Sequence, residues 1–171
     1  MKNNQSERKK SSMPLRITRR SILGVLSLIA QELIESISIK FKLKKPKEEE
    51  VLSIVRLKAE INNPNSVLRI IDNYAYKKTF LMNIGEEKGL LLENAINESK
   101  ANNVLELGVY LGYSTIRILK NLDGNSKLTS IESNKKFAEI ASENINIAGL
   151  SNKHKLIIGK STEVISNLKE K

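Results

Sequence analysis

The sequence lacks several residue types that enzymes use for redox, nucleophilic and metal chemistry. It contains no cysteine and no tryptophan, and its one histidine is His154. The lack of cysteine excludes disulfides, thiolate nucleophiles and sulfur-bound metals. A single histidine cannot build a multi-histidine metal centre, so any metal would need oxygen ligands. Aromatic residues make up only 4% of the chain, so its 40% of hydrophobic residues predicts an aliphatic core.

The positive charge is confined to one end of the chain. The 171 residues carry a net charge of +10, and residues 1–47 account for +9 of it, with 12 Lys and Arg against 3 Asp and Glu. The remainder is long enough for one folded domain and is close to neutral. A general nucleic-acid partner is therefore not expected, because such proteins present a basic surface on the folded domain.

The basic N-terminal segment begins as a polar arm and continues as an amphipathic helix. Residues 1–20 have no apolar period and predict disorder, whereas residues 21–37 carry apolar side chains at three- and four-residue steps. The apolar stretch is shorter than the roughly 20 residues that a membrane span needs. The helix could lie on a membrane surface or pack on its own domain or a partner. Residues 18–23 also resemble a twin-arginine export motif, although no small-x-small cleavage site follows.

A change of pattern near Pro46 indicates a domain boundary. Residues 39–47 alternate apolar residues with lysine up to this proline, which predicts a short exposed strand or a linker. We therefore expect an extension over residues 1–47 and a folded domain over residues 48–171. Two helices, separated by a break at residues 62–65, should begin this domain.

The rest of the domain alternates helices with strands. A third helix is expected after Gly89 and a short buried strand over residues 104–107. The following elements are expected at residues 112–122 (helix), 127–131 (strand), 134–148 (helix) and 155–158 (strand). This alternation predicts an α/β fold in which a parallel sheet is flanked by crossover helices.

The turn after the first predicted strand has the features of a ligand site. Gly108 follows the strand directly and, without a Cβ, lets the backbone pass close to a ligand. Ser114 lies near the start of the next helix, where free N–H groups and the helix dipole favour a carboxylate. Ligands of doubly wound sheets bind at such strand ends. An amino acid carboxylate would suit this position.

Two acids, Glu106 and Glu132, narrow down the ligand. Glu132 follows the second strand, where an acid can accept hydrogen bonds from both ribose hydroxyls, as in dinucleotide-binding domains. Gly108 and Gly112, however, are spaced G-x-x-x-G and not G-x-G-x-x-G. Glu106 beside the turn would repel a pyrophosphate and could attract an amino group. Glu106 could instead be a solvated strand end, and Gly112 only a close packing point for a helix.

The end of the third strand leaves two interpretations open. Residues 159–162, Gly-Lys-Ser-Thr, carry small polar groups that could pair with a purine edge, or they could form a capped turn. His154 lies in a polar loop, and we expect it to be exposed and without a role.

Three segments resemble a known family. They are Ser66–Tyr74, Phe80–Gly89 and Val104–Ser114, and their order and spacing resemble the catechol O-methyltransferase family of class I S-adenosylmethionine-dependent methyltransferases. The likeness runs from about Glu48 to the C-terminus. Met-Asn-hydrophobic-Gly, then Lys-Gly, then Leu-Glu-Leu-Gly-x-Tyr-x-Gly-Tyr-Ser is far more specific than a generic glycine turn.

The resemblance implies a Rossmann-like fold and a cosubstrate site for S-adenosylmethionine. Ile84 and Ser114 would hold its methionine end, and Glu132 its ribose. The floor of the site would be formed by Glu106, Gly108 and Tyr110. The adenine would be surrounded by Ser133, Gly159, Lys160, Ser161 and Thr162. Of these, Ser133 and Thr162 stand where Met and Gln are expected.

The resemblance also implies a reaction, methyl transfer to a hydroxyl of a small-molecule catechol with Mg²⁺ and a lysine base. The family's metal ligands and catalytic lysine would lie beyond Lys171, so no metal ligand or catalytic residue is assigned. We therefore expect a fold truncated after the third strand, and no catechol methylation by these residues alone. A cytosolic cosubstrate favours a cytoplasmic location. Two alternatives remain: a non-catalytic cosubstrate-binding fragment, and a membrane-surface module led by residues 1–47.

Overall fold

The computed structural model describes residues 22–40 and 45–168. The chain divides into two compact units, Met1–Lys45 and Pro46–Lys171. The basic arm expected over residues 1–20, the two arginines of the export-like motif and residues 41–44 lie outside the described residues.

The first unit contains helix α1, Ile22–Lys40. The predicted amphipathic helix is confirmed, but it also takes in Ile39 and Lys40, where the lysine alternation predicted a strand or linker. No proline or glycine lies between Ser27 and Lys40 to end the helix earlier. Its apolar face is exposed, comprising Val25, Leu26, Ile29, Leu33, Ile34 and Ile37. Among the described residues, no helix is long and apolar enough to cross a membrane.

The second unit opens with the two predicted helices, α2 (Lys47–Lys58) and α3 (Pro64–Lys77). Three glutamates in the first turn of α2 complement the helix dipole. At the start of α3, the Asn63 side chain accepts a hydrogen bond from the Ser66 backbone N–H (3.1 Å), and Pro64 occupies the first turn. The break at residues 62–65 therefore works as a helix cap.

Helix α4, Gly85–Ser99, begins earlier than the start after Gly89 that the sequence predicts. Gly85 adopts a positive φ of +73°, which glycine allows at the entry to the helix. Glu86 and Glu87 then occupy the first turn, where acids stabilise the N-terminal end. Polar residues thus start this helix, and a search for apolar periodicity misses them.

The sheet contains three parallel strands in the order β1-β2-β3. They are β1 (Asn103–Leu107), β2 (Lys127–Glu132) and β3 (His154–Ile158). Helix α5 (Tyr113–Leu119) connects the first two strands, and α6 (Lys135–Ile147) with a short 3₁₀ turn, η1 (Ser151–Lys153), connects the last two. Helix α7 (Ser161–Asn167) follows β3. The predicted α/β alternation and parallel sheet are confirmed.

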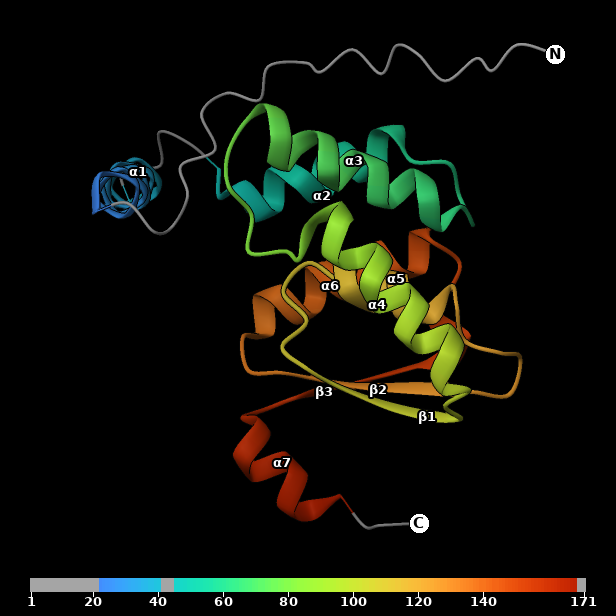
Figure 1. Ribbon diagram of the computed structural model, residues 1–171. Helices are drawn as coiled ribbons and strands as arrows, with labels where there is room; N and C mark the ends of the chain where they lie inside the picture. Colours follow the sequence, from blue (N-terminus) through green and yellow to red (C-terminus); the bar gives the residue numbers. More distant parts are fainter. Residues whose placement is uncertain (1–21, 41–44, 169–171) are drawn as a thin grey trace, which may run out of the picture. The chain divides into compact units, whose positions relative to one another are not determined.

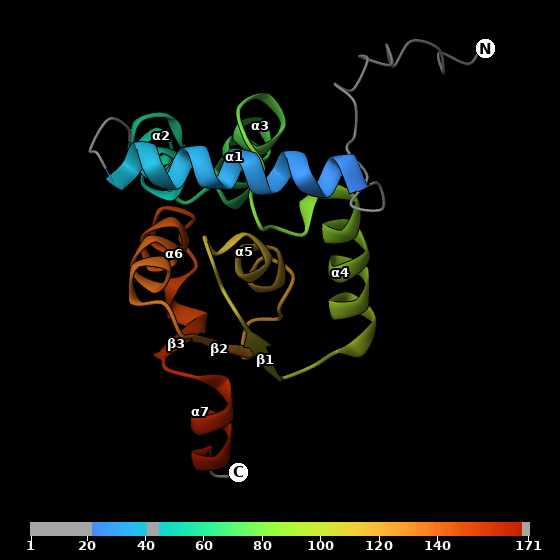
Figure 2. The same ribbon diagram turned by 90° about the vertical axis from the view of Figure 1, so that its left-hand side faces the viewer.

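The helices form layers over one face of this sheet. Helices α4, α5 and α6 lie side by side above the strands, α2 and α3 lie over them, and α7 lies on the opposite face (Figures 1 and 2). The core fills the spaces between these layers. Its largest fully buried apolar side chains are Ile71, Leu81, Leu111, Ile116, Leu119, Leu128, Ile131, Ile145, Val51, Val55 and Val67.

Strand β1 is less buried than the apolar run predicts. Leu105 and Leu107 are 46% and 54% exposed, whereas Glu106 between them is 9% exposed. Successive side chains of a strand point to opposite faces of the sheet. Glu106 points toward α5, where it bonds Thr115, so both leucines point to the other face. The expectation of a buried strand is therefore wrong for Leu105 and Leu107, because the face to which they point is exposed.

Candidate functional site

The carboxyl ends of the three strands meet at one edge of the sheet. The loops after β1 and β3 are both hydrogen-bonded to the end of β2. The Gly108 N–H donates to the Ile131 carbonyl and the Gly159 N–H to the Glu132 carbonyl, each at 2.9 Å. Helix α4 runs back toward the start of β1, so its first turn, beside Ile84, lies toward the same edge (Figure 1). The site residues predicted from separate segments therefore come from strand ends, loops and helix starts.

The turn from β1 to α5 adopts an unusual backbone conformation. Gly108 and Gly112 have φ values of +83° and +82°, and Tyr110 between them has +54°, which is uncommon for a residue with a side chain. A Cβ at Gly112 would lie 3.4 Å from Ala141 of α6, so this glycine is also a close packing point. A Cβ at Gly108 would meet nothing within 4 Å, so one side of the turn is open.

Glu132 holds this turn against the end of β2. One carboxylate oxygen accepts the backbone N–H groups of Val109 (2.9 Å) and Tyr110 (3.1 Å), and the other accepts that of Asn134 (2.8 Å). The side chain is buried, which by itself would raise the pKa, but the backbone donors of Asn134, Tyr110 and Val109 outweigh this and lower the pKa below its ordinary value. Glu132 is therefore an ionised part of the turn.

Glu106 is buried below the turn among hydroxyl groups. Its carboxylate accepts hydrogen bonds from Ser114 (2.5 Å), Thr115 (2.8 Å) and Ser130 (2.7 Å). Burial raises the pKa of Glu106, and the three hydroxyl donors only partly offset that increase. The interpretation of Glu106 as a solvated strand end is therefore wrong, since the side chain is enclosed.

Tyr110 packs against neighbouring elements. Its hydroxyl donates to Glu48 of α2 (2.7 Å), and its ring meets Phe137 edge-on, with ring centres 5.0 Å apart. The ring is buried. These contacts hold the middle of the turn in its positive-φ conformation.

The residues expected around an adenine lie at the ends of β2 and β3. Ser133 is exposed directly after β2, and Gly159 and Lys160 form the turn after β3. Ser161 and Thr162 begin α7, which has no side-chain cap. Lys160 is exposed, and its Nζ lies 3.7 Å from a carboxylate oxygen of Glu163.

His154 is not the exposed loop residue that the sequence predicts. It is the first residue of β3, is partly buried, and its Nε2 lies 2.9 Å from the Ser130 hydroxyl. Burial lowers the pKa of His154 to about 4, so the ring is neutral at pH 7. The polar sequence around it concealed this, because its partner lies 24 positions earlier.

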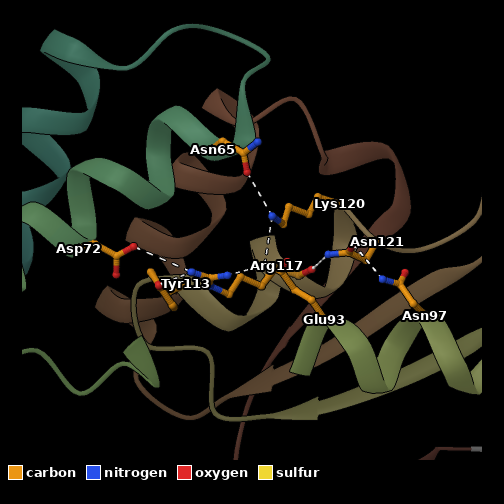
Figure 3. Close-up of polar contacts among 8 residues, drawn as sticks. All are labelled: Asn65, Asp72, Glu93, Asn97, Tyr113, Arg117, Lys120 and Asn121. Carbon is orange, nitrogen blue, oxygen red and sulfur yellow. Dashed lines mark hydrogen bonds and ion pairs between the residues drawn. The ribbon is translucent and has the colours of Figure 1, made fainter. Parts of the chain in front are cut away.

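Sequence reasoning also missed a buried arginine on α5 (Figure 3). Arg117 donates to Glu93 of α4 and, at 2.8 Å, to the Tyr113 hydroxyl, and it lies 4.0 Å from the Asp72 carboxylate of α3. Its side chain is 6% exposed. Burial and a hydrogen bond to Asp72 raise the pKa of Tyr113, so the phenol stays protonated. The available signal was one arginine among the apolar residues 116–119.

Within residues 22–40 and 45–168, no three His, Cys, Asp or Glu side chains are grouped so that they could hold a metal ion.

A parallel sheet with a glycine turn and an acid at each of two strand ends defines a Rossmann-like α/β domain. The family model described as "O-methyltransferase" matches residues 59–171, and the chain belongs to this family. The chain is 38% identical over 125 residues to mouse catechol O-methyltransferase, and the match covers 73% of this chain and 47% of that protein. It is 33% identical over 147 residues to zebrafish catechol O-methyltransferase B, covering 86% and 56%.

A solved structure agrees with the fold. The O-methyltransferase of Bacillus cereus, crystallised in complex with SAH, superimposes with a TM-score of 0.51 at 23% identity, covering 81% of this chain and 56% of that one. The chain thus spans about half the length of the proteins it matches.

Proposed function

We propose that the protein is an S-adenosylmethionine-dependent O-methyltransferase that acts on a catechol. The observation that carries this is the pair of buried acids on either side of the glycine turn, Glu106 and Glu132. An acid below the turn suits the amino group of an amino acid cosubstrate, and an acid at the end of β2 suits a ribose. Residues 48–171 would form the cosubstrate-binding part, and residues 1–47 an extension.

The cosubstrate would extend along the carboxyl edge of the sheet. Its methionine end would lie between Ile84 and Ser114, with Glu106, Gly108 and Tyr110 below it. The open side of Gly108 supports this, because a ligand could lie against the backbone there. The ribose would bind Glu132, and the adenine would lie among Ser133, Gly159, Lys160, Ser161 and Thr162. The bound sulfonium would supply the methyl group, and these residues would orient it.

Binding preference tests this proposal directly. Calorimetry on the full chain should detect S-adenosylmethionine and S-adenosylhomocysteine but not NAD. The reason is that Glu106 lies below the turn, and the spacing of Gly108 and Gly112 does not match that of a pyrophosphate-binding turn. Preference for NAD would overturn the methyltransferase proposal and favour a dinucleotide-dependent oxidoreductase.

Cosubstrate binding without catalysis is the second candidate function. It is favoured by the lack of a metal-binding group among the described residues, which therefore do not fit the Mg²⁺ that methyl transfer to catechols implies. A transfer assay with labelled S-adenosylmethionine, Mg²⁺ and a catechol, run on this chain and on a version extended by the second half of the family's domain, separates the two. Mg²⁺-dependent labelling of the catechol by either version favours the enzyme, and binding without labelling by both favours the non-catalytic module.

We also propose weak binding of the N-terminal extension to anionic membrane surfaces. The exposed apolar face of α1 and the +9 charge of residues 1–47 support it. Co-sedimentation with anionic vesicles should fall for Leu33→Glu on the apolar face. Gln31→Glu is the matched control, since it adds the same charge outside the apolar stripe. Equal binding by both variants and the parent would contradict the proposal.

A further inference from the structure

Arg117 connects three helices through one buried guanidinium group. It contacts Glu93 of α4, Tyr113 of its own helix and Asp72 of α3 (Figure 3). Lys120, the residue that caps the end of α5, approaches the same Glu93 carboxylate oxygen at 3.1 Å. A buried ion pair adds little net stability compared with apolar packing, but its fixed geometry can specify how elements pack. The group therefore joins α3, α4 and α5 through one side chain.

The contact between α4 and α5 is unusually close at Gly89. A Cβ at this position would lie 2.3 Å from Arg117 Nε and 2.6 Å from its Cδ. Arg117 Nε is buried and has no hydrogen-bond partner among the described residues, so the guanidinium lies directly against the α4 backbone. Glycine at 89 is thus needed for this arrangement, although it costs helix propensity.

This cluster lies behind two of the proposed cosubstrate contacts. Tyr113, which binds Arg117, stands between Gly112 of the turn and Ser114. Glu93, the partner on α4, belongs to the helix that begins at Gly85, directly after Ile84. The separation of Ile84 and Ser114 therefore depends on how α4 packs against α5. No atom of Arg117 has to touch the ligand for this dependence to hold.

We propose that Arg117 is a positioning residue, which holds α4 against α5 so that Ile84 and Ser114 lie at the right spacing for the methionine end of the cosubstrate. The inference rests on the proposed function. It predicts that disturbing the contacts of Arg117 weakens the binding only of ligands that possess an amino acid end.

Two ligands separate this role from a purely structural one. S-adenosylhomocysteine carries the amino acid end, whereas 5′-methylthioadenosine has the same nucleoside without it. In Arg117→Lys, affinity for S-adenosylhomocysteine should fall about tenfold, the scale of one lost hydrogen bond to a charged group. Affinity for 5′-methylthioadenosine should change less than about twofold. Arg56→Lys is the matched control, because Arg56 pairs with Glu143 between α2 and α6 and should affect neither ligand.

Gly89→Ala tests the same idea without altering any charged group. The added Cβ should push the Arg117 guanidinium out of place while improving the helix propensity of α4. A selective loss of S-adenosylhomocysteine binding would therefore support the positioning role, even if Arg117→Lys fails to fold. Parent-like binding by Gly89→Ala, or equal losses of both ligands, would overturn the inference. A parent chain that binds neither ligand would instead overturn the proposed function itself.

Discussion

Glu106 and Glu132 are two buried acids on neighbouring strands, but they have different hydrogen-bond donors and opposite pKa shifts. Glu106 accepts hydrogen bonds from three side-chain hydroxyls, whereas Glu132 accepts three from backbone N–H groups. Both are less than 10% exposed. The pKa of Glu106 is nevertheless raised and that of Glu132 lowered. Burial alone therefore does not decide the sign of the shift.

The difference lies in how deeply each carboxylate is enclosed, Glu106 being the deeper of the two, and in what the donors can do. A backbone N–H can only donate, and its direction is fixed by the fold, so Glu132 is matched to the ionised state. A hydroxyl can rotate and can also accept, so Ser114, Thr115 and Ser130 can accommodate a protonated Glu106 or turn toward a ligand. We infer that Glu132 is part of the architecture of the turn, and that Glu106 is the adaptable acid.

The largest effect is expected for Glu132→Ala. It should weaken binding of S-adenosylmethionine by about 1.5–3 kcal/mol, the range for hydrogen bonds to a charged group. Calorimetry should be paired with circular dichroism, because the turn loses three backbone bonds. Glu163→Ala, which removes an exposed acid on α7, is the control and should change little. Similar losses in both variants would mean that Glu132 does not bind the ribose.

Replacing each acid with glutamine should change the stability of the fold by different amounts. Glu132→Gln should lower the free energy of unfolding by about 1–3 kcal/mol, because its NH₂ group must face backbone donors whichever way the amide turns. Glu106→Gln should cost less than about 1 kcal/mol, because rotating hydroxyls can accept from the amide and no carboxylate is then buried. Urea unfolding at pH 7 measures both. A larger loss for Glu106→Gln would reverse our assignment of the two roles.

The two acids should also respond oppositely to pH. Glu132 has a lowered pKa, so its contribution to stability is present above the ordinary value of 4.5 and is lost as the pH falls through the lowered folded value. Glu106 has a raised pKa, so stability decreases as the pH rises from 4.5 through its folded value. Carbon-detected NMR of the side-chain carboxyls, assigned with the two glutamine variants, should place the titrations on opposite sides of 4.5. Coinciding titrations would contradict the contrast.

The last effect, which is confined to acid pH, is expected at His154, which bonds one of the hydroxyls around Glu106. Its pKa is lowered to about 4 from an ordinary value of 6.5, so the unfolded chain binds more protons between these values. Stability should therefore rise with pH from about 4 to 6.5. In His154→Gln, the midpoint temperature of thermal unfolding should depend less on pH across this window. An unchanged slope would show that His154 is solvated.

The sequence predicted the order of helices and strands well because local signals encode it. Apolar runs followed by glycine mark the strand ends, and Asn63 and Asn134 cap the helices that follow them. The spacing of acids and glycines also predicted a role for Glu106, within β1, and for Glu132, the last residue of β2, and the structure brings these to one edge. These features depend on residues close together in the chain.

The features that the sequence did not predict depend on distant partners. The enclosure of Glu106 needs Ser130, which lies 24 positions away, and the burial of Arg117 needs Glu93 of another helix, also 24 positions away. The exposure of Leu105 and Leu107 depends on which face of the sheet the helices cover. Hydrophobic pattern describes one segment at a time, so it cannot identify these neighbours.

The packing of α2 against α6 also constrains when the domain can fold. Arg56 and Lys136 bond partners 87 positions away, and the Tyr110 hydroxyl reaches back 62 positions to Glu48. At a synthesis rate of about 5–20 residues per second, roughly 4–17 seconds separate α2 from its partner helix. During that time α2, whose Val51 and Val55 are fully buried in the finished fold, has no α6 to pack against. The nascent chain is thus most exposed to aggregation and to chaperone binding before α6 is made.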